Sequence, residues 1–205
     1  MKVAIIGGTG KMGLGLATEL SRKHEVYIGS RDRARGERAA SGIPGAKGGD
    51  ELTVAEACDV AVLSIPYEAV ERLGALEAAL AGKLVISPIV PMKVKGGVFY
   101  YALEAGSAAE QVASKLSKSR VAAALHTVPP KFFLKKGGET IDVLIAADER
   151  RTYDEAAALI GCLEGARPLY AGPLSLASSV ESFTALLLNV AKLNGMKTPA
   201  VKFVS

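Results

Sequence analysis

The feature that most restricts this chain is a glycine-rich loop that directly follows its first apolar segment. Residues 2–7 (KVAIIG) form a short apolar run of the kind that is buried on both faces of a parallel sheet. GGTGKMG follows at residues 7–13, and apolar side chains recur every four residues from residue 12 to residue 20, as on one face of a helix. Strand, glycine turn and helix together predict the start of a nucleotide-binding α/β fold.

The glycines of the G-x-G-x-x-G pattern, Gly8, Gly10 and Gly13, have distinct expected roles. The first allows a tight turn, the second lets the backbone approach a pyrophosphate, and the third lets helix and strand pack closely. Free amides at the helix N-terminus face the anion. The pattern therefore predicts a dinucleotide site.

Strand and helix patterns alternate along the rest of the chain. We expect a glycine-rich loop at 41–49 and a Lys/Gly-rich loop at 93–97. Between them, Thr53 and Glu56 form the pattern of a capping box, which predicts the start of a short helix. The other expected strands are 25–29, 59–64, 83–87, 120–125, 141–147 and 167–170, and the other expected helices are 31–40, 68–80, 107–116, 153–163 and 174–193. This alternation predicts a doubly wound parallel sheet of the Rossmann type with a small C-terminal α/β extension that ends in a long helix. We expect a single domain, 1–205, in which residues 120–205 complete the acceptor pocket and a dimer interface.

Composition narrows the class of protein. The two cysteines lack C-x-x-C spacing, so no metal site is expected, and the reduced state fits the cytoplasm. We expect no signal peptide and no membrane helix, because no uninterrupted apolar run reaches 18 residues. The net charge of +4 favours anionic ligands, but no basic stripe with interleaved aromatic residues points to nucleic acid.

The end of the second expected strand bears on cofactor choice. NAD sites usually place Asp or Glu there, about 20 residues after the glycine loop, to bind the ribose hydroxyls. This chain has Ser30 and Arg31, with Arg33 and Arg35 in the next turn. Forked arginine donors suit a phosphate ester, so NADP is favoured over NAD. Arg33 could equally be a solvated surface residue.

Carbonyl chemistry of the short-chain dehydrogenase type is disfavoured. Those enzymes share a G-G-T-G loop and need a Tyr-x-x-x-Lys pair to move a proton. No tyrosine of this chain is followed four places later by lysine.

Three proline-containing segments, 64–67, 87–91 and 125–130, each follow an expected strand. Ligands bind at the carboxyl ends of strands in open α/β sheets, so these loops should converge on the nicotinamide and form an apolar wall for a flat ring. His126 is either a structural residue at a strand end or part of this site, whereas His24 is expected on the surface. Glu181 is expected to be a cap or ion-pair residue without a catalytic role.

The whole chain resembles the deazaflavin-dependent NADP oxidoreductases, which move hydride between NADPH and coenzyme F420. The most particular segments are ALHTVP at 124–129 and AGPLS at 171–175. Further matching segments are 7–13, 29–31, 57–59, 65–66, 87–91, 167–169, 180–182 and 194–196. The chain departs from the family at 41–49, which is shorter, and at 131–139, which is more basic.

The resemblance implies a homo-oligomeric enzyme in which the deazaflavin lies over the nicotinamide. It implies two sets of binding residues besides His126, which would orient the acceptor. The set for NADP is Gly8, Thr9, Gly10, Lys11, Met12, Gly13, Ser30, Arg31, Arg35, Ile65 and Pro66, and the set for the acceptor is Ser87, Pro88, Ile89, Val90, Thr127, Val128 and Pro129. Arg35 stands where the family often has lysine, which keeps the positive charge.

Other functions stay open on the sequence alone. A related NADPH-dependent reductase could use a flavin or ferric ion as acceptor, because the NADP half would look the same. A reductase of the pyrroline-carboxylate type would need a larger helical C-terminal region. A non-catalytic NADP sensor would keep the glycine loop and Arg31 but would not need the apolar loops.

Overall fold

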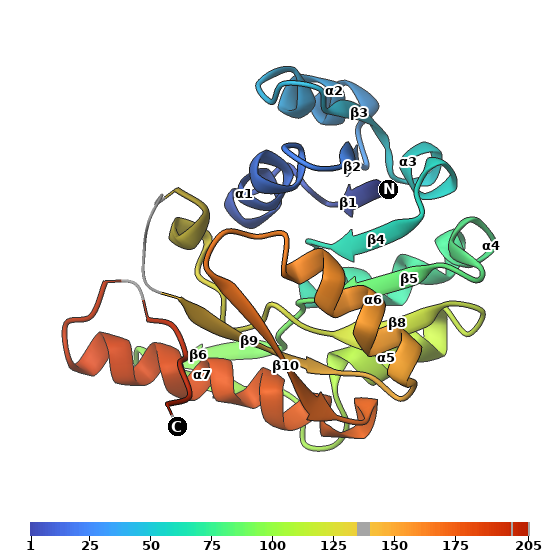
Figure 1. The fold of residues 1–205 in the computed structure, drawn as a ribbon. Coiled ribbons are helices and arrows are strands. Elements are labelled where there is room, and N and C mark those ends of the chain that lie inside the picture. The colour runs from blue at the N-terminus through green and yellow to red at the C-terminus, as the bar shows by residue number, and fades with distance from the viewer. Residues whose placement is uncertain (135–139, 198, 205) are drawn as a thin grey trace.

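The computed structural model describes residues 1–134, 140–197 and 199–204 (Figure 1). Its centre is an eight-stranded sheet in the order β10-β9-β8-β5-β4-β1-β2-β3, beside which a separate hairpin pairs β6 with β7. The strands of the large sheet are β1 (Lys2–Ile6), β2 (Glu25–Ser30), β3 (Lys47–Asp50), β4 (Val60–Leu63), β5 (Leu84–Ser87), β8 (Arg120–Ala123), β9 (Ile141–Ala146) and β10 (Ala166–Gly172). The hairpin strands are β6 (Met92–Lys95) and β7 (Val98–Tyr101).

Helices cover both faces of the sheet. The α-helices are α1 (Lys11–Leu20), α2 (Arg33–Ser41), α3 (Glu51–Ala57), α4 (Glu77–Leu80), α5 (Ala108–Lys115), α6 (Arg150–Ile160) and α7 (Ala177–Leu193). The 3-10 helices are η1 (Tyr67–Leu76), η2 (Pro130–Leu134) and η3 (Leu174–Leu176).

Alternate residues of the strands feed two separate cores. In β1, Val3 and Ile5 join one core with side chains of α1, α2 and α6, whereas Ala4 and Ile6 join the other with side chains of α3, η1 and α5. Burial on both faces explains why the strand is an uninterrupted apolar run, as the sequence indicated. The doubly wound arrangement is confirmed.

The sheet is not parallel throughout, which corrects one expectation. From β3 to β8 every pair is parallel, but β8 meets β9 in antiparallel pairing at Ala123 and Ala146, and β10 runs parallel to β9. A parallel return normally needs a long crossover that includes a helix. The described part of the connection 124–140 contains only the short helix η2.

Several local expectations also change. The expected loop 41–49 contains the start of β3, and the expected loop 93–97 lies in the β6–β7 hairpin. The helix expected at 68–80 is mostly the 3-10 helix η1, with only one α-helical turn, α4, at its end. Residues 135–139 of the basic segment 131–139 lie outside the described residues.

The capping box of Thr53 and Glu56 is wrong, because the cap of α3 stands three residues earlier. The Asp50 carboxylate accepts hydrogen bonds from the backbone N–H of Thr53 and from its hydroxyl, both at 2.8 Å. Asp50 therefore caps the helix, and Thr53 lies inside it.

The segment Leu174–Leu193 has the length and composition of a membrane span, with a mean hydropathy of 1.4. In the structure it forms η3 and α7, which runs along the lower side of the molecule in Figure 1. Glu181 in its middle is fully buried within the fold. Because one face of α7 packs on α5 and β7, its apolar residues contribute to this fold.

Glu181 joins three elements through its carboxylate. Oε2 accepts hydrogen bonds from the Ala108 N–H (2.9 Å) and the Tyr101 hydroxyl (2.7 Å), and Oε1 accepts one from the Ala109 N–H (3.0 Å). Glu181 thus binds the first two amides of α5, which agrees with the expected role of a cap. Burial raises the pKa of this carboxyl, and the hydrogen bonds oppose the rise.

Candidate dinucleotide and acceptor site

The glycine turn has the geometry that the sequence predicted. A Cβ atom on Gly13 would lie 2.4 Å from the Cα of Gly8, so the third glycine allows α1 to pack against the turn. At Gly10 a Cβ would meet nothing within 4 Å, which leaves room for a ligand near the backbone. Gly10 is the N-cap of α1 and makes no side-chain hydrogen bond to the helix. The amides of the first turn of α1 are therefore not capped by its N-cap side chain, and they suit an anion.

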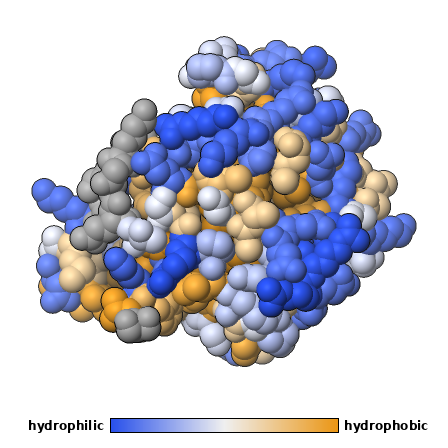
Figure 2. Space-filling view, in the orientation of Figure 1, coloured by the Kyte–Doolittle hydropathy of each residue, from blue (hydrophilic) through white to orange (hydrophobic). Residues whose placement is uncertain are grey.

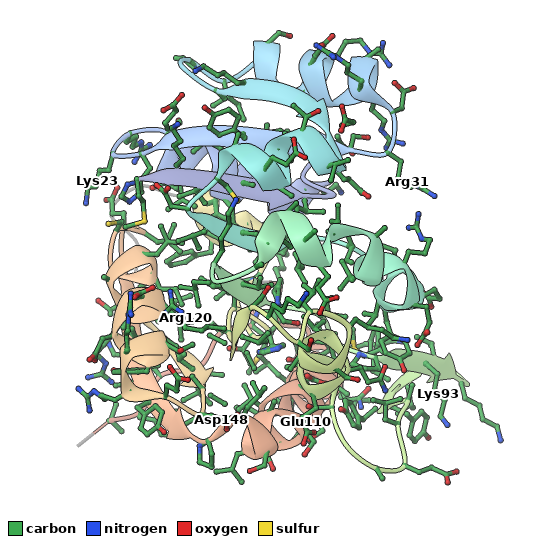
Figure 3. The ribbon with its side chains drawn as sticks, turned by 90° about the vertical axis from the view of Figure 1, so that its right-hand side faces the viewer. Lys23, Arg31, Lys93, Glu110, Arg120 and Asp148 are labelled. Atoms are coloured by element: carbon green, nitrogen blue, oxygen red, sulfur yellow. The ribbon has the colours of Figure 1, made fainter. Side chains whose placement is uncertain are left out.

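The arginines after β2 differ in their partners. The Nε of Arg33 donates to Glu37 at 2.8 Å, whereas the described residues include no carboxylate within ion-pair distance of Arg31 or Arg35. In Figure 3, Arg31 points away from the body of the molecule, on the same side as Lys93 of the hairpin. Arg31 and Arg35 can therefore bind an anion, while Arg33 is already paired.

Asp32 does not act as the carboxylate of an NAD site. Its Oδ1 accepts a hydrogen bond from the backbone N–H of Arg35 at 3.2 Å, so its side chain caps α2. Ser30, the last residue of β2, is buried. The strand end therefore offers a hydroxyl and unpaired arginines instead of a free carboxylate.

A cavity of about 840 Å³ extends from the glycine turn past these arginines. Its lining residues are Gly7, Thr9, Gly10, Ser30, Arg31, Asp32, Arg35, Glu51, Ser64, Ile65, Pro66, Glu68, Ala69 and Arg72. A further cavity of about 460 Å³ shares Glu51, Ile65, Ala69 and Arg72 with it. The expected residues Thr9, Gly10, Ser30, Arg31, Arg35, Ile65 and Pro66 are thus brought together.

Another cavity, of about 300 Å³, shares Ser64, Ile65 and Pro66 with the cavity of about 840 Å³. The cavity of about 840 Å³ is called the first cavity below, and the cavity of about 300 Å³ the second. Its other lining residues are Met12, Leu63, Tyr67, Pro88, Ile89, Val90, Met92, Leu125, His126, Val128, Pro130 and Thr184. No Asp, Glu, Lys or Arg is among these residues. This cavity therefore suits a flat and largely apolar ring, as the strand-end loops indicated.

His126 is held neutral in this cavity. Its side chain is 7% exposed, and neither ring nitrogen has a hydrogen-bond partner among the described residues. Burial lowers the pKa of the imidazole to about 3. A neutral imidazole offers one donor and one acceptor, which suits binding of a polar ring edge.

The residue before His126 has an unusual backbone conformation. Leu125 has a backbone φ of 71°, which is a left-handed conformation that residues other than glycine rarely adopt. Such strained positions cluster at functional sites, where the surrounding structure keeps them in place. Here the turn at Leu125 places both Leu125 and His126 in the lining of the cavity.

Some expected site residues lie elsewhere. Met12 lines the second cavity instead of the first, whereas Gly8, Lys11 and Gly13 line neither. The expected acceptor residues Ser87, Thr127 and Pro129 are also missing from the described lining, and Ser87 and Thr127 are buried in the fold. Glu51, Arg72, Met92 and Thr184 were not expected, and each comes from a segment without a sequence motif.

The relatives of this chain identify its family. The family model "NADP oxidoreductase coenzyme F420-dependent" matches residues 2–91. The F420-dependent NADP reductase of Methanothermobacter marburgensis is 36% identical over 100% of this chain and 99% of that protein. The chain belongs to the family of coenzyme F420-dependent NADP oxidoreductases. The enzyme of the same name from Methanocaldococcus jannaschii is 30% identical over 93% of this chain and 92% of that protein.

Solved structures show the same fold. A protein from Arthrobacter sp. FB24, assigned as an F420-dependent NADP reductase, gives a TM-score of 0.88 at 21% identity, with both chains fully covered. An imine reductase from Streptomyces aurantiacus gives a TM-score of 0.68 at 23% identity, with 95% of this chain and 64% of that chain covered. This chain thus shares its whole fold with the first structure and with part of the longer imine reductase.

Proposed function

We propose that this member of the family transfers hydride directly between NADP(H) and coenzyme F420 where its two cavities meet. The observation that carries the proposal is that Ser64, Ile65 and Pro66 line both cavities, so that ligands in the two cavities would lie next to each other. NADPH would supply a hydride, which carries two electrons and one proton, and become NADP⁺, while the deazaflavin would take up this hydride and one further proton from solvent. The chain's own task is to hold the two rings in contact and to keep water out.

The first cavity is proposed to hold NADP by its pyrophosphate and its 2′-phosphate. The backbone around Thr9 and Gly10 would bind the pyrophosphate at the start of α1. Ser30, Arg31 and Arg35 would bind the 2′-phosphate, since both arginines lack a carboxylate partner among the described residues. A guanidinium can hold two phosphate oxygens at once, which favours NADP over NAD.

The second cavity is proposed to hold the deazaflavin ring. Pro88, Ile89, Val90 and Val128 supply an apolar wall, and His126 supplies a neutral hydrogen-bonding group for the ring edge. This lining gives no support to a ferric acceptor, because it offers no carboxylate or other charged ligand. It also argues against an NADP sensor, which would have no use for a second apolar cavity at the nicotinamide.

The test uses NADPH that carries deuterium at the transferred position. Mixing the protein with this NADPH and oxidised deazaflavin should bleach the deazaflavin absorbance, and the label should appear on the reduced deazaflavin. Loss of the label to solvent before it reaches the acceptor would exclude direct transfer. Absence of bleaching would exclude the reaction itself.

We further propose a cytoplasmic homodimer in which α7 lies at the interface. Leu186, Val190 and Leu193 on α7 are 56%, 41% and 81% exposed. Figure 2 shows apolar residues gathered at the lower left, over the C-terminal end of α7. An exposed apolar helix face suits a self-complementary twofold contact, whereas Leu174 and Val180 of the same segment are buried in the fold.

Light scattering at micromolar concentration should therefore give twice the mass of one chain. The double variant Leu186→Ser, Val190→Thr should shift the mass toward that of the monomer. Both side chains are exposed in the single chain, so their replacement removes apolar surface from the proposed interface without changing the core. A monomer mass for the unmodified protein would contradict the proposal.

A further inference from the structure

Leu125 lies between β8 and His126, and it belongs to neither set of binding residues that the sequence indicated. We propose that Leu125 is a positioning residue, whose left-handed backbone and buried side chain hold the His126 imidazole in the direction that the acceptor ring requires. The inference rests on the proposed function, because it explains how the chain orients a hydrogen-bonding group of the second cavity.

The first observation is that hydrogen bonds to the protein do not orient His126. Neither ring nitrogen has a hydrogen-bond partner among the described residues, although the side chain is buried. The direction of such a side chain depends on its packing and on the local backbone, which decides the rotamers that it can adopt. The backbone conformation of Leu125 therefore sets the direction in which the chain enters His126.

The second observation is the cost of that backbone conformation. Leu125 has a φ of 71°, and every other described residue with a positive φ is a glycine. Glycine adopts this conformation without a steric cost, whereas in other residues the Cβ atom comes too close to the following carbonyl oxygen. The chain thus has leucine where the backbone alone would favour glycine, which indicates that the side chain is needed.

Burial of the Leu125 side chain offsets this cost. The side chain is 3% exposed and belongs to the same core as Val128 and Phe133, which lie further along the same segment. Removing a leucine side chain from water is favourable by an amount that matches or exceeds the cost of one left-handed residue. The core therefore keeps Leu125 in a conformation that its backbone would otherwise leave.

The chain is also fixed on both sides of His126. Before it, the Ala124 N–H donates to the Ser87 carbonyl at 3.1 Å, which continues the pairing of β8 with β5. After it, the Val128 N–H donates to the Leu125 carbonyl at 3.2 Å and closes a tight turn. A strained conformation persists where the surrounding structure holds it in this way.

The end of the same segment packs on α1. A Cβ atom on Gly15 of α1 would lie 2.7 Å from Cδ2 of Phe133, so this glycine makes room for the phenylalanine ring. The segment from Leu125 to Phe133 thus runs between two fixed ends, and His126 lies next to the strained one.

The test replaces Leu125 with isoleucine, which has the same volume but branches at Cβ. A β-branched side chain disfavours a positive φ, so the backbone should leave the left-handed conformation and turn the imidazole away from its present direction. We expect kcat/KM for the deazaflavin to fall about 5- to 50-fold, which does not exceed the loss that removing the imidazole itself would cause. The Kd for NADP⁺ should stay unchanged, because Leu125 does not line the first cavity.

Two further variants act as controls. Leu159 of α6 is also 3% exposed in the same core but has a helical backbone, so Leu159→Ile should leave kcat/KM unchanged. Leu125→Met keeps an unbranched side chain of similar volume and should recover most of the activity that Leu125→Ile loses.

A double-mutant cycle separates positioning of His126 from a direct contact of Leu125 with the acceptor. When His126 is already alanine, Leu125→Ile should lower kcat/KM by less than about twofold, because no imidazole is left to orient. A direct contact, or general damage to the fold, would instead give the same fold-loss in both backgrounds.

Equal losses in the two backgrounds, or an unchanged kcat/KM in folded Leu125→Ile, would overturn the inference and leave the proposed function intact. If the isoleucine variant does not fold, Leu125→Ala and Leu125→Gly take its place. Both remove the side chain, but glycine adopts the left-handed conformation without a steric cost, so alanine should lose more activity, and equal losses would overturn the inference. If the unmodified protein does not reduce deazaflavin with NADPH, the proposed function fails and the inference fails with it.

Discussion

Replacing Arg31 with alanine is expected to raise the Kd for NADPH by about 10- to 150-fold and to leave the Kd for NADH nearly unchanged. The reason is the loss of a charge-assisted contact to the 2′-phosphate, which contributes about 1.5–3 kcal/mol. Arg31 lines the larger cavity and has no carboxylate partner among the described residues, so its guanidinium is available for that contact. Titration of both cofactors by fluorescence measures the two Kd values.

Arg33 provides a matched control from the same turn. Its guanidinium is paired with Glu37 at 2.8 Å and does not line the cavity, so Arg33→Ala should change the Kd for NADPH by less than about twofold. The unmodified protein should bind NADPH at least about tenfold more tightly than NADH. Equal affinities for the two cofactors would refute the assignment of the 2′-phosphate site.

His126→Ala is expected to lower kcat/KM for the deazaflavin by about 10- to 100-fold, a loss of roughly 1.4–2.7 kcal/mol. This is the size of one lost contact to the acceptor, whereas removal of a general acid or base commonly costs up to about 10⁴-fold. The Kd for NADP should stay nearly unchanged, because His126 does not line the larger cavity. Steady-state kinetics with separate NADP titration distinguishes these effects.

The pH dependence offers an independent check on His126. Burial lowers its pKa from the ordinary 6.5 to about 3 in the folded protein, so the imidazole stays neutral near pH 7. The profile of kcat/KM between pH 5 and 9 should therefore show no step that disappears in His126→Ala. Such a step would show that His126 exchanges a proton during the reaction.

The same shift has a consequence for stability. Below pH 6.5 the unfolded chain takes up a proton that the folded chain does not, so this stability is fully present above pH 6.5 and is lost as the pH falls toward 3. The loss approaches about 1.4 kcal/mol per pH unit for this one group. Denaturant titrations at several pH values should show a shallower slope for His126→Ala over that range.

The sequence predicted the NADP half of the site better than the acceptor half. Gly10 lies in the turn after β1, and Ser30 and Arg31 lie at the end of β2. The end of a strand in a parallel sheet has a known place. The sequence predicted β1 as a strand because a strand buried on both faces is an uninterrupted apolar run. By contrast, Thr184 lines its cavity from α7, which is held against α5 and β7 by hydrogen bonds of Glu181 and Asn189 to residues more than 70 positions away.

The other differences between the expectations from the sequence and the structure also have local causes. The resemblance placed Met12 among the residues that bind NADP, but Met12, in the first turn of α1, lines the second cavity instead of the first. The reversed direction of β9 follows from a connection whose described part contains only a 3-10 turn, which no hydrophobic period revealed. Ser87 and Thr127 follow strands as expected, but their side chains are buried away from the cavity.

Because Ser64, Ile65 and Pro66 line both cavities, the two ligands can influence each other's binding through this segment. A shift of this segment when one ligand binds changes the surface that the other ligand meets. By linkage, whatever factor NADP⁺ imposes on the Kd for deazaflavin, the deazaflavin imposes on the Kd for NADP⁺. A chain with this shared segment can therefore discriminate against unmatched pairs of ligands at the binding stage, before any hydride moves.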